Sequence, residues 1–272
     1  MHRTIVASTS VQIVDFFVIG VQKGGTTALD MYLRNVSGIQ MASKKEPHHF
    51  DNESIDWSTN ASDNLHRFFH WQPGVSVVRG EATPIYSYWP NALERLYRYN
   101  PSAKLIMCLR HPGFRAYSHW HMETQRGDEN MPFAAAVSRT GRLRVSADPS
   151  GVHRTFSYVE RGFYSYQIER ALALFPRTHI HFLRSDEHWN QPEQTRRRLL
   201  SFLGIAPNAP SHTAGVEPRA TKSMYALTAN AFAEVARLNA VYADDIQRTQ
   251  ELTGITLSDW LDDDYREPMA HA

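Results

Sequence analysis

The sequence has a single cysteine, Cys108, in 272 residues. One thiol cannot form a disulfide within the chain, which excludes the disulfide-stabilised folds that are common among small secreted domains. This cysteine usage is compatible with a reducing compartment. We therefore predict a cytoplasmic protein.

A long apolar run is also missing. Residues 11–21 are apolar, but the stretch is short, contains Asp15 and has no small-residue cleavage pattern, so we expect no signal peptide. No segment approaches the roughly 20 apolar residues that a transmembrane helix needs. The sequence predicts no stable membrane insertion.

Charge of one sign is not in excess. The 29 Lys and Arg residues are balanced by 28 Asp and Glu residues, which gives a formal net charge of +1. Such a chain has no strong basic field for nucleic acid, so we predict no nucleic-acid partner. No repeat or low-complexity tract is present, and the length fits one domain over residues 1–272. The oligomeric state is left open.

The sequence does contain an apolar run that enters a glycine-rich turn. Residues 16–21 are rich in aromatic and β-branched residues and predict a buried strand, and residues 27–36 predict an amphipathic helix. The turn between them consists of Lys23, Gly24, Gly25, Thr26 and Thr27. The two glycines allow backbone N–H groups to approach an anion, and the helix N-terminus and Lys23 add positive charge. The pattern predicts an anion-binding loop.

The order of residues in this turn disfavours an ordinary ATP-binding loop. In a Walker A loop the lysine follows the glycines, whereas Lys23 precedes them, and the chain contains no Gly-Lys pair. The turn resembles the phosphosulfate loop of sulfotransferases that use 3′-phosphoadenosine 5′-phosphosulfate (PAPS), in which a Lys-x-Gly-Thr-Thr turn follows the first strand. The resemblance implies that residues 23–27 bind the 5′-phosphosulfate and that Lys23 stabilises the leaving group.

A polar segment, residues 43–51, follows the predicted first helix. Taken alone, it fits a solvated charged loop. It resembles the Lys-Glu-Pro-His segment of heparan-type sulfotransferases, and His49 stands where an aromatic residue is usual. The resemblance implies that Glu46 is the catalytic base and that His48 orients Glu46 or the substrate.

A second anion-binding motif follows a buried strand predicted over residues 104–109. Pro112 can begin the next helix, which leaves Arg110 at the carboxyl end of the strand, where open α/β sheets bind ligands. The segment resembles the family's Arg-Asp-Pro-x-x-Arg-x-x-Ser motif, which implies that Arg110 and Ser118 hold the 3′-phosphate of PAPS. A guanidinium suits a phosphate because it donates two parallel hydrogen bonds. The sequence does not explain His111 in the aspartate position.

Two weaker resemblances complete the set. Residues 79–86 resemble the family's Gly-Glu-Lys-Ser/Thr-Pro-x-Tyr segment, with Ala82 in the lysine position. We therefore expect a cationic group near the acceptor to be missing, which disfavours a sulfated polysaccharide acceptor. Arg219 and Lys222 stand where the family has a late Lys-Gly-Arg loop that closes over the cofactor, which implies cofactor contacts for both.

The remaining segments give coarser predictions. We predict strands over 75–78 and 179–183, helices over 91–99, 192–202 and 225–252, an aromatic substrate wall over 51–74 and a mobile substrate flap over 123–154. For Tyr164 we favour a role in packing over a role in lining the pocket. His66 and His70 could share a helix face, but no third ligand is evident, so we predict no metal site.

We therefore predict an α/β protein, a P-loop-like three-layer sandwich with a central parallel sheet flanked by helices. The resemblance implies a PAPS-dependent sulfotransferase that needs no metal. Its acceptor would be a hydroxyl, in preference to an amine, of a small metabolite, glycolipid or oligosaccharide. A nucleotide or phosphometabolite kinase and a non-catalytic nucleotide-binding regulator are the alternatives.

Overall fold

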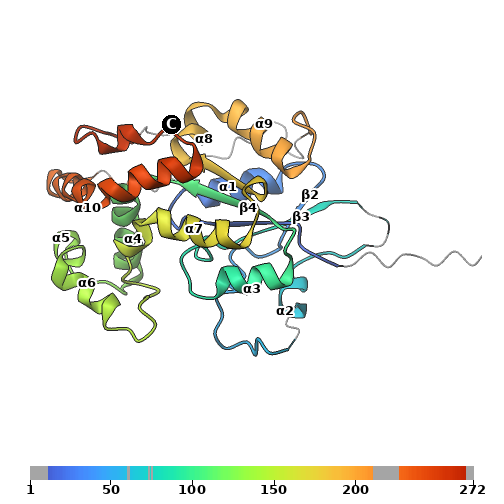
Figure 1. The fold of residues 1–272 in the computed structure, drawn as a ribbon, viewed down its shortest axis with the longest axis horizontal. Coiled ribbons are helices and arrows are strands. Elements are labelled where there is room, and N and C mark those ends of the chain that lie inside the picture. Colours follow the sequence, from blue (N-terminus) through green and yellow to red (C-terminus); the bar gives the residue numbers. More distant parts are fainter. Residues whose placement is uncertain (1–11, 60–61, 73, 75, 211–226, 268–272) are drawn as a thin grey trace, which may run out of the picture.

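The computed structural model describes residues 12–59, 62–72, 74, 76–210 and 227–267. Five parallel strands form one sheet in the order β2-β3-β1-β4-β5 (Figure 1). Their bounds are β1 Phe16–Gly20, β2 Ile39–Met41, β3 Val78–Ala82, β4 Lys104–Leu109 and β5 Ile180–Arg184. The prediction of a central parallel sheet is confirmed.

Helices cover both faces of the sheet (Figure 1). Their bounds are α1 Thr26–Arg34, α2 Asp63–His66, α3 Ala92–Tyr99, α4 Pro112–Arg126, α5 Phe133–Ala136, α6 Arg139–Ser146, α7 Tyr164–Leu174, α8 Ser185–Asn190, α9 Pro192–Leu203 and α10 Ala229–Thr253. Because side chains alternate along a strand, β1 feeds two cores. Phe16 and Val18 pack with α1 and α9, whereas Phe17 and Ile19 pack with α3, α4, α7 and α10. The result is the predicted three-layer arrangement.

Most predicted elements agree with the structure to within a few residues, but the strand predicted over 75–78 is wrong. The observed β3 continues through Gly80 and Glu81 to Ala82. A Cβ at Gly80 would lie 1.9 Å from Cζ of Phe16, so the glycine makes room for that ring. Glu81 is fully buried, and burial raises its pKa to about 8, so it is neutral near pH 7. Gly80 and Glu81 are residue types that are rare in buried strands, so the sequence did not predict that β3 continues through them.

The segment 123–154, predicted as a flap, is half helical. Helix α4 runs to Arg126 and ends at Gly127, whose φ of 82° is the left-handed conformation of a helix C-terminus. Helices α5 and α6 follow, and Phe133 and Val137 are buried in the core. The prediction was wrong because glycines that end or pack helices resembled loop punctuation.

The aromatic residues of 51–74 are not a substrate wall. Phe69 is buried in the core, and Trp57, Phe68 and Trp71 pack against it. Arg95 and Arg79 stack on the rings of Trp57 and Trp71, which covers these aromatic faces with protein. Their role in the structure is therefore packing.

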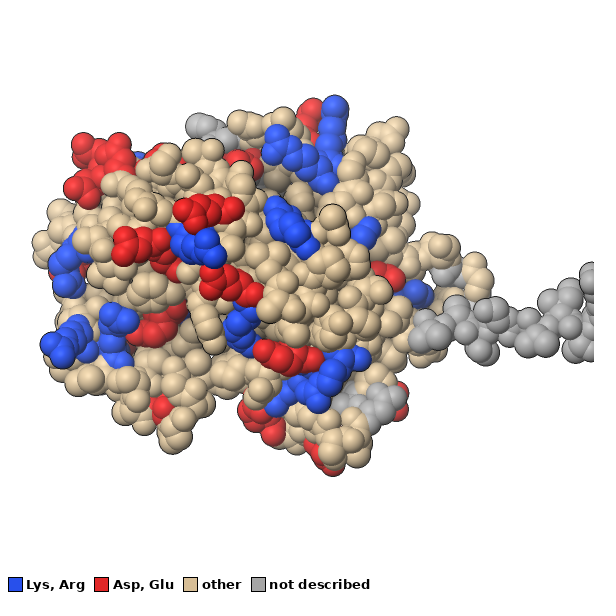
Figure 2. Space-filling view, viewed as in Figure 1, with Lys and Arg blue, Asp and Glu red and all other residues tan. Residues whose placement is uncertain are grey.

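The surface agrees with the balanced composition. On the face seen in Figure 2, basic and acidic side chains are interspersed over most of the area. Among the helices in the described part of the chain, none has the length and apolar character needed to cross a membrane.

Candidate active site

A cavity of about 830 Å³ lies at the carboxyl edge of the sheet. Its walls include residues one or two positions beyond the ends of strands: Gln22 after β1, Pro84 after β3, Arg110 after β4 and Ser185 after β5. This edge is where open α/β sheets bind ligands. The predicted site residues on its wall are Lys23, Gly25, Thr26, Thr27, Glu46, His48, Arg110 and Ser118. Arg219 and Lys222 lie outside the described residues.

The glycine turn has the backbone geometry that an anion-binding loop needs. A Cβ at Gly24 would lie 2.4 Å from the carbonyl oxygen of Cys108. The turn can therefore pack this closely on β4 only if residue 24 is glycine. Gly25 caps α1 with φ of 89°, a conformation that favours glycine. The first N–H groups of α1 have no partner within the helix, which leaves them available to an anion.

Lys23 lies in a positively charged corner of the cavity. Its Nζ is 3.8 Å from Sδ of Met122. Burial lowers the pKa of Lys23, and the neighbouring charges of Arg110 and Arg126 lower it further. A bound anion would relieve this repulsion, so the corner favours a negatively charged ligand.

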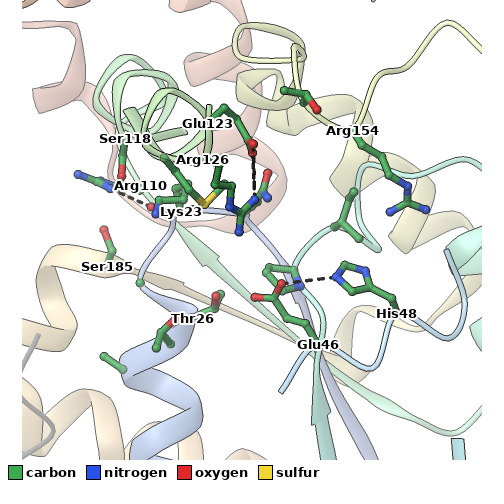
Figure 3. A pocket seen from close by; sticks show the side chains of 18 of the residues that line it. Lys23, Thr26, Glu46, His48, Arg110, Ser118, Glu123, Arg126, Arg154 and Ser185 are labelled. Carbon is green, nitrogen blue, oxygen red and sulfur yellow. Dashed lines mark hydrogen bonds and ion pairs between the residues drawn. The ribbon is translucent and has the colours of Figure 1, made fainter. Parts of the chain in front are cut away.

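Arg110 is held in place by the backbone around it. Its Nη1 donates to the carbonyl oxygen of Lys23 at 2.9 Å, and the Tyr164 hydroxyl donates to the Arg110 carbonyl oxygen at 2.7 Å. Tyr164 is fully buried, so its prediction as a packing residue is confirmed. Figure 3 shows Arg110, Lys23 and Ser118 on one side of the cavity.

His111, which the sequence left unexplained, caps helix α4. Its Nδ1 accepts from the backbone N–H groups of Gly113 and Phe114, and its Nε2 donates to the carbonyl oxygen of Trp260 at 3.1 Å. Burial lowers its pKa to about 4, so the ring is neutral and Nδ1 is free to accept. A neutral imidazole thus performs the capping role for which aspartate is a preferred residue.

Glu46 and His48 face the other side of the cavity and belong to a chain of paired charges (Figure 3). Nε2 of His48 lies 3.6 Å from Oε2 of Glu46, and its Nδ1 lies 2.9 Å from Oδ2 of Asp51. Asp51 has no exposed side-chain area and also receives a hydrogen bond of 2.6 Å from Nη1 of Arg154. Lys45 pairs with the other oxygen of Glu46.

These contacts set the protonation of the pair. The Asp51 and Glu46 hydrogen bonds raise the pKa of His48 to about 9. Burial raises the pKa of Glu46, but His48 and Lys45 outweigh it and hold that pKa at about 2. At neutral pH a charged imidazolium therefore faces an ionised carboxylate.

Backbone strain marks the same residues. Lys23, Glu46 and His48 have φ of 66°, 55° and 54°. Among the described residues, Asn91 is the other non-glycine residue with positive φ. A left-handed backbone costs energy at such residues and persists where the surroundings impose it, often at functional sites.

His49 does not belong to the cavity with Glu46. It is buried, with its ring 4.7 Å from Phe50 and 5.2 Å from Trp57. Burial lowers its pKa to about 4, so it packs as a neutral ring in the position where an aromatic residue was expected.

Several cavity residues escaped the sequence analysis. They are Gln22, Asn52, Pro84, Met122, Glu123, Arg126, Asp128, Arg154, Ser185, Asp186 and Glu267. Arg126 could have been predicted to line the cavity, because it lies eight residues after Ser118 on the same face of α4. Ser185 could also have been predicted, because it directly follows a strand. Arg154 and Glu267 reach the site from distant parts of the sequence and gave no local signal.

The positions of cationic groups correct one expectation. Ala82 is buried in the core with α1, so its side chain faces away from the cavity. Arg126 and Arg154 line the cavity instead, with side chains 58% and 45% exposed. Positive charge is therefore present on the wall, supplied by other segments.

The described residues contain no group of three or more His, Cys, Asp or Glu side chains arranged to hold a metal ion. His66, one of the two histidines considered for a metal, instead lies 2.9 Å from the hydroxyl of Tyr99.

Fold and cavity together define an α/β protein that presents an anion-binding loop at the carboxyl ends of its strands. The family model described as "Sulfotransferase domain" matches residues 14–260. The chain belongs to the sulfotransferase family. The predicted resemblance to PAPS-dependent enzymes of the heparan type is thereby confirmed.

Individual relatives support this assignment. Heparan sulfate glucosamine 3-O-sulfotransferase 5 of Homo sapiens is 25% identical over 218 residues, which cover 78% of this chain and 59% of the relative. Membrane-associated sulfotransferase kil1 of Dictyostelium discoideum is 36% identical over 118 residues, 41% of this chain and 23% of the relative. A crystal structure of a sulfotransferase from Alicyclobacillus acidocaldarius has a TM-score of 0.73 and 25% identity, and the match covers 92% of this chain and 99% of that one. The chain thus spans less than two thirds of the human relative and nearly all of the bacterial one.

Proposed function

We propose that this protein transfers the sulfuryl group of PAPS to a hydroxyl of an acceptor. The observation that carries the proposal is that Lys23, Arg110 and Ser118 share one cavity with Glu46 and His48. We call Lys23–Thr27, Arg110 and Ser118 the donor side, and Glu46, His48, Asp51 and Arg154 the acceptor side. An anion-binding surface thus faces a carboxylate, as transfer from an anionic donor requires.

The donor side would hold both ends of the nucleotide. The turn at residues 24–27 offers backbone and hydroxyl donors to the 5′-phosphate, while Arg110 and Ser118 bind the 3′-phosphate. Arg219 and Lys222 would add further cofactor contacts. Lys23 stabilises the negative charge that grows on the bridging oxygen as the S–O bond breaks.

The acceptor side would remove the proton of the attacking hydroxyl. The acceptor oxygen attacks sulfur in line with the leaving 5′-phosphate oxygen, the new O–S bond forms, and Glu46 takes the proton as 3′-phosphoadenosine 5′-phosphate (PAP) leaves. A carboxylate of pKa about 2 is a weak base. Because Lys45 now occupies one Glu46 oxygen, an acceptor hydroxyl that displaces Lys45 would also raise the pKa of Glu46.

The acceptor is an alcohol of a small metabolite, glycolipid or oligosaccharide, with an amine as the lesser candidate. Arg126 and Arg154 pair with Glu123 and Asp51 but keep 58% and 45% of their side chains exposed, so they can contact an acceptor that carries negative charge. The relatives named for heparan sulfate glucosamine make a carbohydrate acceptor the first to test.

The test is sulfate transfer from sulfur-labelled PAPS to a panel of neutral and anionic oligosaccharides, glycolipids and small alcohols, with product identification by mass. We expect a labelled product and no requirement for added metal. PAP binding without transfer to any member of the panel or of an extract of the source organism would favour a non-catalytic regulator. Tighter binding of ATP with Mg²⁺ than of PAPS would favour a kinase.

A further inference from the structure

Arg110 is already occupied by an acid of the same chain. Its Nε donates to Oε1 of Glu267 at 2.7 Å, and its Nη2 donates to Oε2 at 2.6 Å. This is the two-bond fork that a guanidinium forms with a phosphate. The two side chains are 20% and 21% exposed, so the pair is mostly shielded from water.

The chain around Glu267 is fixed by its neighbours. The ring of Tyr265 stacks on His111 at 5.1 Å with an interplanar angle of 10°, and its hydroxyl donates to Oδ2 of Asp186 at 3.2 Å. The guanidinium of Arg266 lies 3.6 Å from the ring centre of Phe232. These contacts bring Glu267 to the cavity wall, where it lines the same space as Arg110 and Ser118.

A phosphate and this carboxylate cannot both use the fork of Arg110. Nε and Nη2 bind Glu267, and Nη1 donates to the carbonyl oxygen of Lys23, so each nitrogen of the guanidinium already has a partner. An anion that remained nearby would also repel the phosphate. A ligand phosphate must therefore displace Glu267, whereas a nucleotide without a phosphate at that position leaves the pair intact.

We propose that Glu267 is an internal competitor for the 3′-phosphate of the donor, an inference that rests on the proposed role of Arg110. Competition lowers the apparent affinity for PAPS and PAP by the fraction of molecules in which Arg110 is free. It sharpens discrimination as well, because only a ligand with a 3′-phosphate replaces the contact that it breaks. The return of Glu267 to Arg110 would then assist release of PAP after transfer.

The test compares Glu267→Ala with Asp264→Ala in the full chain. Asp264→Ala is a matched control because this substitution removes the same charge from the same segment. The side chain of Asp264 is 96% exposed. Calorimetric titration with PAP should show about 10-fold tighter binding for Glu267→Ala and no change for Asp264→Ala. Titration with adenosine 5′-monophosphate, which has no 3′-phosphate, should not distinguish the variants. Unchanged or weaker PAP binding by a folded Glu267→Ala protein would overturn the inference.

Arg110→Ala separates this inference from the proposed function. If Arg110→Ala binds PAP as well as the wild type does, the 3′-phosphate lies elsewhere and the donor-side assignment fails. If Arg110→Ala weakens PAP binding but Glu267→Ala leaves it unchanged, the assignment stands and the competition is absent. When Arg110→Ala is already present, adding Glu267→Ala should not tighten PAP binding, because the two residues act through one contact.

Discussion

The two sides of the cavity are positioned by different means. On the donor side, the glycine turn and Arg110 directly follow β1 and β4, which are adjacent in the sheet, so backbone hydrogen bonds set their separation. On the acceptor side, Glu46 and His48 lie in a segment without helix or strand. The backbone N–H of Glu46 donates to the carbonyl oxygen of Ala82 at the end of β3, while the two side chains are held by ion pairs with Lys45 and Asp51. The comparison teaches that the proposed donor side is positioned by the sheet, whereas the side chains of the proposed acceptor side are oriented mainly by ionisable neighbours.

The largest effect should come from the donor side. Lys23→Ala removes the cation at the bridging oxygen, and we expect kcat/KM for sulfate transfer to fall on the order of 10³-fold. Lys44→Ala, at an exposed lysine near the acceptor segment, is the control and should retain activity. Retained activity in Lys23→Ala would mean that the sheet edge does not supply the transition-state charge.

The acceptor side should affect turnover without affecting the nucleotide. Glu46→Gln keeps the shape of the side chain but cannot take a proton, so kcat should fall on the order of 10²-fold or more. The affinity for PAP, measured by calorimetry, should stay within about two-fold of the wild type because the donor side is unaltered. A fully active Glu46→Gln enzyme would remove Glu46 from the role of base, and a large loss of PAP affinity would break the division between the two sides.

The charged chain on the acceptor side predicts a pH dependence of stability. His48 has its pKa raised from 6.5 to about 9 in the folded protein, so its contribution is present below pH 6.5 and is lost as pH rises through about 9. Because the side chain is partly exposed, we expect a loss on the order of 1 kcal/mol over this range. Urea unfolding of the wild type and of His48→Gln should show a difference that shrinks towards high pH. A constant difference would mean that His48 does not carry a charge there.

The smallest effect concerns the support of the donor side. His111→Ala removes the cap of α4 and should cost about 1 kcal/mol of unfolding free energy, whereas His111→Asp should recover part of it. Sulfate transfer should change little in either variant, since His111 does not line the cavity. A larger loss of activity than of stability would indicate that the cap also aligns Arg110.

The residues proposed as the donor side could be picked out from the sequence because their signals are local, and the structure brings most of them to one cavity. A strand, a turn with Gly24 and Gly25 and a helix follow one another, so a short window contains the whole loop. Arg110 was found in the same way, from a strand that ends beside a helix-starting proline. Residues 219–223 are the part of this prediction that lies outside the described residues.

The acceptor side was predicted less completely because its contacts are distant in sequence. Glu46 and His48 were named by resemblance, but Arg154, which pairs with the Asp51 that holds His48, lies 103 residues from Asp51. Glu267 reaches Arg110 across 157 residues. No local pattern encodes such pairs, which depend on where the helices between them pack.

The errors in the fold prediction have the same origin. Gly80 lies beyond the strand predicted over 75–78 but belongs to β3, where the ring of Phe16 fills the space of a side chain. Gly141 lies within the segment predicted as a flap, yet it belongs to α6, where a Cβ would meet the carbonyl oxygen of Ala135 at 2.2 Å. In both places tertiary contact, not turn geometry, requires the glycine.

The most direct test of the account is a crystal structure of the protein with PAP. The account predicts the 3′-phosphate on Arg110 and Ser118, the 5′-phosphate on the turn at residues 23–27, and Glu267 displaced from Arg110. Nucleotide bound outside this cavity, or with both phosphates away from Lys23 and Arg110, would contradict it.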